Sequence, residues 1–453
     1  MIKITLVASA ISMMFAVSVQ AKVSEAEAAK LGDTLTPIGA EKAGNADGSI
    51  PPWEGGITAP PASYEAGMHH PNPYPEDKVL YTITKENLVE HQELLTPGQI
   101  ALFNTYPDSF KMSVYPTRRS ASFPQVAYDW TKTNATRAEL VDGGNGLKNA
   151  AIGTPFPIPA NGLEVIWNHL TRYRGQALTR KAGQAAPTAN GSYTYIGLDE
   201  ALLLPYNNSN ADPAVLEETN ILFKFKQKVT QPARLAGTAL LVHETMDQIK
   251  TPRQAWTYNT GQRRVRRAPN VAYDAPGTAA DGLRTTDDYD MFNGSPNRYN
   301  WTLVGKKELL IPYNTYELHS DKLAYDDILK AGHINPEYVR YEKHRVWVVE
   351  ANLKEGISHI YKKRVFYIDE DSWQVSVADM YDNRDQLYRV AMAHGLNYYE
   401  LPAHWSTLEV FHDLNSKRYI AIGLDNQEAM YNFGVELKDN AFSASALRKE
   451  GRR

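Results

Sequence analysis

The sequence contains no cysteine among its 453 residues. A disulfide framework, a thiolate nucleophile and a lipid attached to an N-terminal cysteine are therefore excluded. A strong charge excess is also lacking, because 48 basic and 52 acidic residues leave a formal net charge of -4. A dedicated nucleic-acid-binding protein would carry a strongly basic domain, so no nucleic-acid partner is expected.

Sequence motifs of common enzymes are absent as well. The chain has no Gly-x-Ser-x-Gly elbow, no Walker phosphate-binding loop and no dinucleotide glycine pattern. His69 and His70 are adjacent, but neighbouring side chains on an extended chain point apart, and no third ligand has a recognisable spacing. We therefore expect no metal, no cofactor and no enzymatic activity.

Four acidic residues require a separate interpretation, because paired carboxylates are the machinery of glycosyl transfer. Asp369, Glu370 and Asp371 lie together in a short link between two apolar segments, and Asp379 follows in the next segment. Acidic residues are common in hairpin turns, where water solvates them. We interpret the first three as solvated turn residues.

A long hydrophobic run is present only at the N-terminus, from Ile4 to Val19 after Lys3. It falls short of the roughly 20 apolar residues of a membrane span. It ends in Val19-Gln20-Ala21, with small residues at the positions that a signal peptidase reads. Residues 1–21 are thus predicted to be a cleaved signal peptide rather than a membrane anchor. The mature chain, beginning at Lys22, is expected to be soluble in the periplasm.

Residues 22–75 are predicted to form a short helix followed by an extended arm. Ser24 and Glu27 have the spacing of a capping box, and Gly32 is placed to end the helix. The following stretch is rich in proline, glycine and asparagine, which is typical of an arm or a linker. Trp53 and Tyr64 favour an arm packed on a body, because a free linker gains nothing from large rings.

Residues 76–453 are predicted to form a curved antiparallel β-sheet domain with a helical cover. Short helices are expected at 86–95, 97–103 and 163–173, and a longer one at 320–333. No repeat of fixed period is visible, which disfavours a propeller or solenoid. Segments with strand-like alternation and short links lie at 220–230, 235–246, 253–268, 298–311, 339–353, 359–368, 373–381, 386–394 and 407–424.

About nine or ten antiparallel strands in one sheet cannot stay flat, since strand twist curls such a sheet. The fold is therefore expected to be mainly β, a half-closed barrel with a concave apolar face. Helices either fill that face as a core or cover it partly and leave a cavity for a hydrophobic ligand. Within 339–353, Val346 and Val348 alternate with Trp347 and Val349, so this strand is predicted to be buried on both faces.

The stretch QAWTYNTGQRRVRRAPN at 254–270 predicts a hairpin that joins aromatic and basic side chains. A two-residue turn at Thr260-Gly261 places Trp256 opposite Val265 and Tyr258 opposite Arg263. A three-residue turn brings Arg264 and Arg266 beside the rings instead. Either register gives the aromatic face two arginines able to bind a phosphate or carboxylate. The basic residues of the predicted binding site are Arg263, Arg264, Arg266 and Arg267.

An alternative is that these arginines form a solvated strand edge that discourages aggregation. The acidic stretch RTTDDYDMF at 284–292 favours a site, because Asp287, Asp288 and Asp290 are candidates to pair with the arginines as a latch. The predicted binding residues accordingly include Trp256, Tyr258, Asp287 and Asp288 besides the four arginines.

Four segments carry a resemblance to a known family. They are VSEAEAAKLGDTLTPIGAEKAGNADGSIPPWEGG, WTYNTGQRRVRRAP, HINPEYVRYEKHRVWVVEANLKEG and YIDEDSWQVSVADMYD. Together they resemble the exported proteins grouped as domain of unknown function 1329. That family resembles periplasmic lipoprotein carriers and outer-membrane lipoprotein-sorting proteins, which implies a half-closed barrel lined with apolar side chains under a helical lid. The resemblance further implies a partner, an exporter of the resistance, nodulation and division type.

The combined interpretation is a periplasmic carrier that takes a lipid or other hydrophobic molecule from an envelope transporter towards the outer membrane. An acyl chain of about 15 methylenes exposed to water costs on the order of 12 kcal/mol, at roughly 0.8 kcal/mol each. A shielding cavity removes most of that cost. Two alternatives remain: an envelope hydrolase acting on a lipid or glycan, with a perturbed carboxylate or nucleophile in the cavity, and a structural β scaffold with a filled interior.

Overall fold

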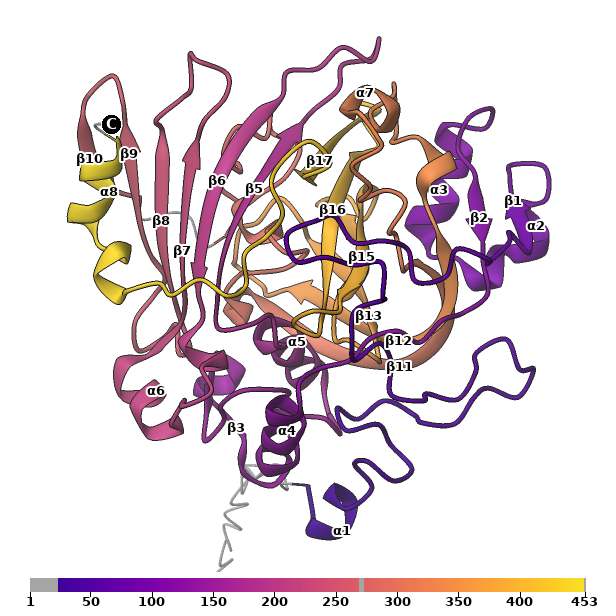
Figure 1. The fold of residues 1–453 in the computed structure, drawn as a ribbon, viewed down its shortest axis with the longest axis horizontal. Helices are drawn as coiled ribbons and strands as arrows, with labels where there is room; N and C mark the ends of the chain where they lie inside the picture. Colours follow the sequence, from indigo (N-terminus) through magenta and orange to yellow (C-terminus); the bar gives the residue numbers. More distant parts are fainter. Residues whose placement is uncertain (1–22, 269–272, 452–453) are drawn as a thin grey trace, which may run out of the picture.

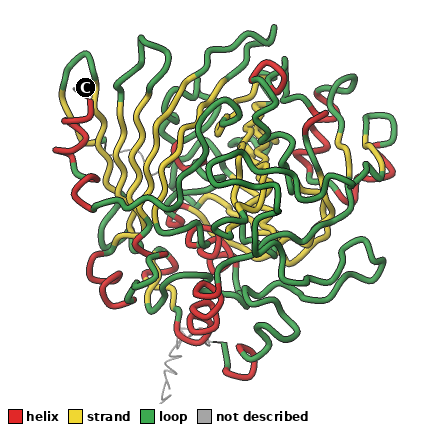
Figure 2. The backbone as a smooth tube through the Cα atoms, viewed as in Figure 1, coloured by secondary structure: helices red, strands yellow, loops and turns green. Residues whose placement is uncertain are grey.

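A computed structural model describes residues 23–268 and 273–451 of the chain (Figure 1). The predicted signal peptide, residues 1–21, lies outside the described residues. The fold is mainly β, as expected, and is dominated by one large sheet that curls around a central core (Figures 1 and 2). In the described part of the chain, no helix combines the length and the apolar character needed to cross a membrane.

The sheet has 15 strands in the described residues, and a separate hairpin pairs β3 with β4. Its neighbours run in the order β1-β2-β12-β13-β14-β15-β16-β17-β5-β6-β7-β8-β9-β10, with β11 on the free side of β12. The strands are β1 Tyr81–Ile83, β2 Met112–Val114, β3 Glu139–Val141, β4 Gly146–Lys148, β5 Ala177–Ala185, β6 Ile196–Leu203, β7 Ile221–Val229, β8 Ala239–Thr245, β9 Gln254–Asn259, β10 Arg264–Arg267, β11 Tyr299–Pro312, β12 Tyr341–Leu353, β13 Lys363–Asp369, β14 Val375–Tyr381, β15 Leu387–Tyr398, β16 Ala403–Asp413 and β17 Arg418–Leu424.

Two antiparallel meanders make up this sheet. β11 to β17 form one and β5 to β10 the other, and β17 joins them by pairing with β5. One parallel contact, between Tyr341 and Val114, attaches the small β1–β2 pair. β10 and β11 end the two meanders and do not pair, so the barrel stays half-closed, as the sequence predicted. The central strands β5 and β6 were not predicted.

The helices are short and lie against the sheet faces or beside its ends. They are α1 Glu25–Ala28, α2 Leu88–His91, α3 Pro97–Thr105, α4 Gln125–Arg137, α5 Gly162–Thr171, α6 Pro213–Thr219, α7 Tyr325–Ile328 and α8 Ala444–Gly451. The long helix expected at 320–333 is wrong, because only α7 forms there. The backbone of Ile328 and Leu329 instead pairs with the returning segment at Ile334 and Asn335.

Both faces of the sheet are covered. We call the face that packs on α5 the inner face; its core includes Trp167 of α5, Phe366 of β13 and Phe411 of β16. The opposite, outer face of β12–β17 is covered by α3 and the segment around α7. The outer face of β6–β9 is covered by the C-terminal segment with α8 (Figure 1).

The N-terminal arm is packed on the body rather than free. Ser24 and Glu27 form the predicted capping box of α1. Farther along, the indole of Trp53 donates to the carbonyl of Ala121 at 3.3 Å. The Arg119 guanidinium donates to the carbonyl oxygens of Glu41, Lys42 and Pro51, which holds the arm over the turn between β13 and β14. Ile38, Ala40 and Ile50 of the arm are buried as well, so apolar and polar contacts both attach the arm.

Candidate functional site

The inner face contains a pocket of about 210 Å³ between strands β7–β9 and the segment 273–293. We call it the inner pocket, its strand side the floor and segment 273–293 the roof. The floor is mostly apolar and the roof mostly polar. The lining residues are Phe223, Phe225, Gln227, Leu240, Val242, Arg253, Thr257, Pro276, Gly277, Thr278, Arg284, Thr286, Tyr289 and Asn293.

The floor follows from strand alternation. Phe223 and Phe225 lie two residues apart on β7, and Leu240 and Val242 lie two residues apart on β8, so all four side chains point to the inner face. Phe225 and Val242 are direct partners in the β7–β8 register. The intervening β7 residues, such as Lys224, point to the outer face. A period-two pattern thus builds an apolar surface on one side of β7–β8.

The roof is held by buried ion pairs and hydrogen bonds to strand β13 and its neighbourhood. Asp287 pairs with the Arg364 guanidinium at 2.6 Å and with the His359 ring at 3.0 Å. The Tyr361 hydroxyl donates to Asp288 at 2.9 Å. The Arg364 guanidinium holds the pKa of Asp287 well below its usual range despite burial. These contacts fix the position of the roof relative to the sheet.

Two arginines line the inner pocket, and they differ in their partners. Arg253 forms an ion pair of 2.5 Å with Glu244 and donates to the carbonyl of Asn293. Arg284 is 6% exposed and donates to the carbonyl of Thr285 at 3.2 Å, but it has no ion pair among the described residues, and its Nε has no hydrogen-bond partner there. Burial lowers the pKa of Arg284. A buried guanidinium without a carboxylate is costly, so it marks the pocket as a candidate anion site.

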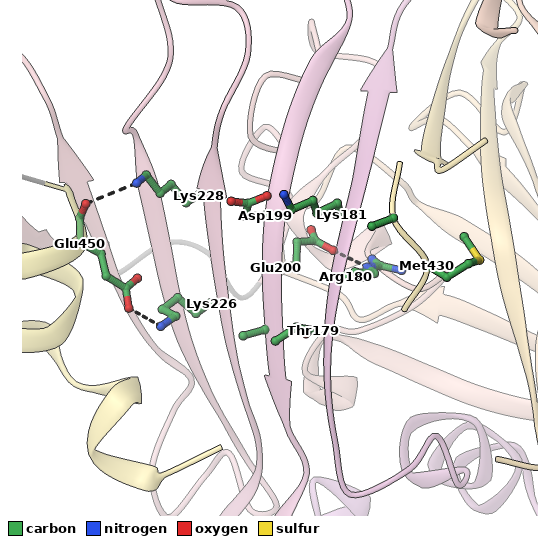
Figure 3. Close-up of a pocket in the computed structure, with 11 residues that line it drawn as sticks. Thr179, Arg180, Lys181, Asp199, Glu200, Lys226, Lys228, Met430 and Glu450 are labelled. Carbon is green, nitrogen blue, oxygen red and sulfur yellow. Dashed lines mark hydrogen bonds and ion pairs between the residues drawn. The ribbon is translucent and has the colours of Figure 1, made fainter. Parts of the chain in front are cut away.

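A second, more open hollow of about 550 Å³ lies on the outer face of β5–β7 (Figure 3). Lys226 and Lys228 point towards Glu450 of α8, and the Lys226–Glu450 ion pair measures 2.5 Å. Met430 closes the opposite side (Figure 3). Lys226 already has a carboxylate partner, and Lys228 donates to the backbone carbonyl of Glu450 at 3.4 Å. Because both lysines are engaged and the hollow is wide, it offers less selectivity than the inner pocket.

The aromatic and arginine hairpin forms as β9 and β10, but both predicted registers are wrong. Trp256 lies opposite Arg267 and Tyr258 opposite Val265, which leaves a four-residue loop at 260–263. The aromatic face therefore carries one β10 arginine, Arg267, whose guanidinium lies 5.8 Å from the Trp256 ring centre. Tyr258 is buried beneath α8 and is part of the core.

The other arginines of the hairpin are exposed. Arg264 and Arg266 lie opposite Asn259 and Thr257, on the other side of the strand, and Arg263 lies in the loop. No carboxylate among the described residues forms an ion pair with any of the four arginines. The expected latch is therefore wrong: Asp287 and Asp288 bind Arg364, His359 and Tyr361 instead, and Asp290 pairs with Arg172 and Arg174.

The acidic turn after β13 is also corrected by the structure. Asp369, Glu370 and Asp371 are at most 3% exposed and do not face water. The Arg119 guanidinium holds both oxygens of Asp371, at 2.7 and 2.8 Å, and Lys306 pairs with Glu370 at 2.7 Å. Burial raises the pKa of Asp369 to about 7. The turn is thus an anchor for the N-terminal arm.

One group within this anchor has the composition of a metal site. His344, Asp369 and Asp371 place one ligand atom each within 4.8 Å of one another. Arg119 already occupies both oxygens of Asp371, so a cation is in place and a second one would be repelled. His70, predicted not to bind metal, is hydrogen-bonded to His319 at 3.0 Å and to Glu400 at 2.8 Å, and burial lowers its pKa.

Comparison with known proteins places the chain in a family. The model of the family described as "Protein of unknown function (DUF1329)" matches residues 82–448. The chain belongs to the DUF1329 family. An uncharacterized protein of Pseudomonas aeruginosa is 53% identical to it over 439 residues, which cover 97% of this chain and 96% of the relative. The resemblance identified from the sequence is therefore confirmed.

Solved structures similar to this DUF1329 protein are distant in sequence. A putative outer membrane lipoprotein-sorting protein domain from Vibrio parahaemolyticus is 14% identical with a TM-score of 0.43, over 63% of this chain and 98% of that one. A DUF1329 family protein from Desulfovibrio piger is 15% identical with a TM-score of 0.41, over 60% and 92%. A LolA superfamily protein from Nitrosomonas europaea is 11% identical with a TM-score of 0.38, over 63% and 98%.

Sequence reasoning about this DUF1329 chain overlooked the arginine that lines the inner pocket. Arg284 opens the very stretch, RTTDDYDMF, in which only the aspartates received attention. A single arginine beside three acidic residues is typical of an exposed loop in which the arginine offsets part of the acidic charge. The useful signal was the strand-like spacing of Phe223, Phe225, Leu240 and Val242, which predicted the apolar surface that the loop covers.

Proposed function

We propose that this DUF1329 protein binds a lipid or other hydrophobic molecule in the inner pocket and carries it through the periplasm towards the outer membrane. The supporting observation is the pocket itself, in which apolar side chains of β7 and β8 face a polar roof that contains the buried Arg284. Ligand pockets are typically apolar with a few well-placed polar groups. The predicted signal peptide supports the compartment.

The size of the pocket limits what it encloses. A volume of 210 Å³ equals about seven waters at roughly 30 Å³ each, so the pocket holds a short acyl segment rather than a complete lipid. Each buried methylene contributes about 0.8 kcal/mol. The proposal therefore requires that a longer chain either leaves the pocket at its open side or displaces part of the roof.

The rival functions receive less support. A hydrolase would place a perturbed carboxylate in the cavity. Burial raises the pKa of Asp369, Asp379 and Glu409 to about 7, yet none of these three lines the inner pocket. A structural scaffold would fill its interior completely, whereas the inner pocket leaves the floor of β7–β8 partly uncovered.

The exposed arginines of the β9–β10 hairpin are proposed to contact an anionic surface during loading or delivery. Arg263, Arg264, Arg266 and Arg267 give a local positive field on a protein that is acidic overall. The resemblance to exported DUF1329 proteins extends the proposal to a donor, an exporter of the resistance, nodulation and division type. The electrostatic contact with an anionic surface does not depend on which partner presents it.

Dye binding tests the proposed pocket. The uncharged dye N-phenyl-1-naphthylamine fluoresces in apolar sites and should bind the purified protein at a single site. Leu240→Trp fills the pocket from its floor and should abolish the signal, because the added ring takes the ligand's space. Val304→Trp adds the same ring at an exposed β11 position and is the matched control. Equal fluorescence from the two variants would refute the pocket as the binding site.

A further inference from the structure

We infer that the ligand of the inner pocket is an amphiphile with an anionic head group, which Arg284 binds while the acyl chain lies on the β7–β8 floor. This inference rests on the proposed function and adds the chemical class of the ligand. A carboxylate and a phosphate ester both present oxygen atoms that accept from a guanidinium, so anionic oxygen is the chemistry that they share.

The position of Arg284 carries the inference. The residue lies on the roof and lines the pocket, and it is only 6% exposed. Its recorded hydrogen bond, to the carbonyl of Thr285, uses one of the five N–H groups of a guanidinium. Its Nε is buried without a partner in the described residues. The guanidinium therefore retains donors for an incoming group.

The roof backbone is shaped around this guanidinium. The Gly277 backbone is so close that a Cβ atom there would lie 2.9 Å from Arg284 Cζ and 3.0 Å from its Nη1. The amide of Gly277 donates to the carbonyl of Arg284 at 3.1 Å, and Pro276 and Thr285 form an isolated bridge. A residue larger than glycine at position 277 would displace the guanidinium. The local fold therefore leaves a specific space for the Arg284 guanidinium.

The acidic groups around Arg284 have other partners. Asp288 accepts from the Thr285 amide at 2.8 Å and from the Tyr361 hydroxyl. Glu200 pairs with Arg180 and accepts from Gln227 at 2.5 Å. These carboxylates, with Glu409, act on Arg284 through space and partly offset the lowering of its pKa by burial. None of them forms an ion pair with it in the described residues.

The second arginine of the pocket does not compete for this role. Arg253 is already matched by the Glu244 carboxylate, at 2.5 Å. An anion next to Arg253 would also face Glu244 and be repelled. An anion next to Arg284 would instead form the direct ion pair that this buried cation lacks among the described residues, which is the arrangement in which charge-assisted hydrogen bonds are strong.

The test compares two ligands with the same chain and different head groups. The measurement is the displacement of N-phenyl-1-naphthylamine from the purified protein by decanoate and by decanol at pH 8, where the carboxylate is ionised. Decanoate should bind about tenfold or more tightly than decanol, since hydrogen bonds to charged groups are the stronger class. Equal binding of both ligands would overturn the inference and leave the proposed function standing. Failure of both to displace the dye would overturn the two together.

Variants then assign the preference to Arg284. Arg284→Gln should reduce the preference for decanoate over decanol to about unity. The exposed Arg384→Gln is the matched control and should retain the preference. The midpoint of thermal unfolding of Arg284→Gln should not fall, because the change removes an unpaired buried charge.

A second variant covers the case in which Arg284→Gln does not fold. Gly277→Ala keeps the arginine but pushes its guanidinium out of place, and should also lose the decanoate preference. A persistent preference in folded Arg284→Gln, or in Gly277→Ala if only that variant folds, would overturn the assignment to Arg284.

Discussion

Burial raises the pKa of some carboxylates of this protein. Asp379 of β14 is completely buried against the start of α3. It accepts from the Gly98 amide at 3.1 Å and from the hydroxyls of Thr96 and Tyr367, each at 3.3 Å. Burial raises its pKa to about 7, although these hydrogen bonds act in the opposite direction. The loss of hydration therefore outweighs three donors, which is expected because no described residue forms an ion pair with this carboxylate.

This pKa makes the stability of the protein depend on pH. The unfolded pKa of an aspartate is about 3.9, so from about pH 4 to 7 the unfolded state loses the proton that folded Asp379 keeps. The folded state is thereby destabilised as pH rises through this window. The free energy of unfolding of Asp379→Asn, relative to that of the parent protein, should rise by about 1.4 kcal/mol per pH unit between about pH 4 and 7. Above about pH 7 this difference should stay constant.

Urea unfolding at pH 4, 5.5, 7 and 8.5 measures this difference. The pH 4 data serve as the internal reference, since folded Asp379 is then protonated and unfolded Asp379 about half protonated, so that most of the difference develops only above pH 4. A difference in the free energy of unfolding that stays constant from pH 4 to 8.5 would contradict the raised pKa.

Single residues were the hardest feature to predict from the sequence. Asp369, Glu370 and Asp371 have turn-like composition, and nothing near them in the chain announces Arg119, which lies about 250 positions away and holds Asp371. Arg284 was overlooked for the same reason, because burial beneath a roof is a tertiary property. Residue type and spacing therefore indicated the apolar floor but not the charges that face it.

At the level of elements, the β9–β10 hairpin is an open edge of the sheet covered with positive charge. Reversal of Arg264 and Arg267 to Glu should leave the midpoint of thermal unfolding nearly unchanged, since exposed substitutions usually change stability by within about 0.5 kcal/mol. Binding to vesicles that contain anionic lipid should fall steeply, and transfer of a labelled lipid between donor and acceptor vesicles should fall with it.

A matched control separates this contact from net charge. Arg137→Glu with Arg384→Glu makes the same charge change at exposed sites outside the hairpin, at the end of α4 and in the β14–β15 turn. Equal loss of vesicle binding in both double variants would mean that overall charge, not the hairpin, attracts the membrane. Unchanged transfer in the hairpin variant would favour a solvated edge strand.

Elements with regular patterns were predicted well. β12 has Val346 and Val348 buried on one face and Val349 buried on the other, as its apolar run indicated, while Trp347 on the second face is half-buried. β5 and β6 were not predicted because charged residues at their centres interrupt the apolar alternation. These residues are Arg180 and Lys181 in β5 and Asp199 and Glu200 in β6. The α4 sequence QVAYDWTKTNATR is rich in threonine and asparagine, which are weak helix formers, so tertiary packing decides its helix.

At the level of the whole molecule, Arg119 connects the arm to the sheet. It is 6% exposed and satisfies Asp371 and three arm carbonyls. Arg119→Met should lower the free energy of unfolding by about 3–5 kcal/mol, because Asp371 becomes an uncompensated buried charge. The neighbouring Arg118→Met should cost within about 1 kcal/mol, since the Arg118 side chain is 45% exposed.

Chemical denaturation and limited trypsin digestion measure these effects together. Faster cleavage after Lys42 in Arg119→Met, but not in Arg118→Met, would show that the arm has detached. Equal cleavage rates and equal stability for the two variants would contradict a role of Arg119 in holding the arm.

The junction between the two meanders also determines when the protein can acquire its sheet. Ala185 of β5 pairs with Ala421 of β17, which lies 236 positions farther along the chain. During synthesis β5 emerges long before β17, so the β5–β10 meander presents an unpaired hydrogen-bonding edge until the last strands arrive. Pairing across such a large sequence separation slows folding. A chain truncated before β17 would keep this edge exposed, and β5 is therefore the segment through which such a chain would associate with other chains.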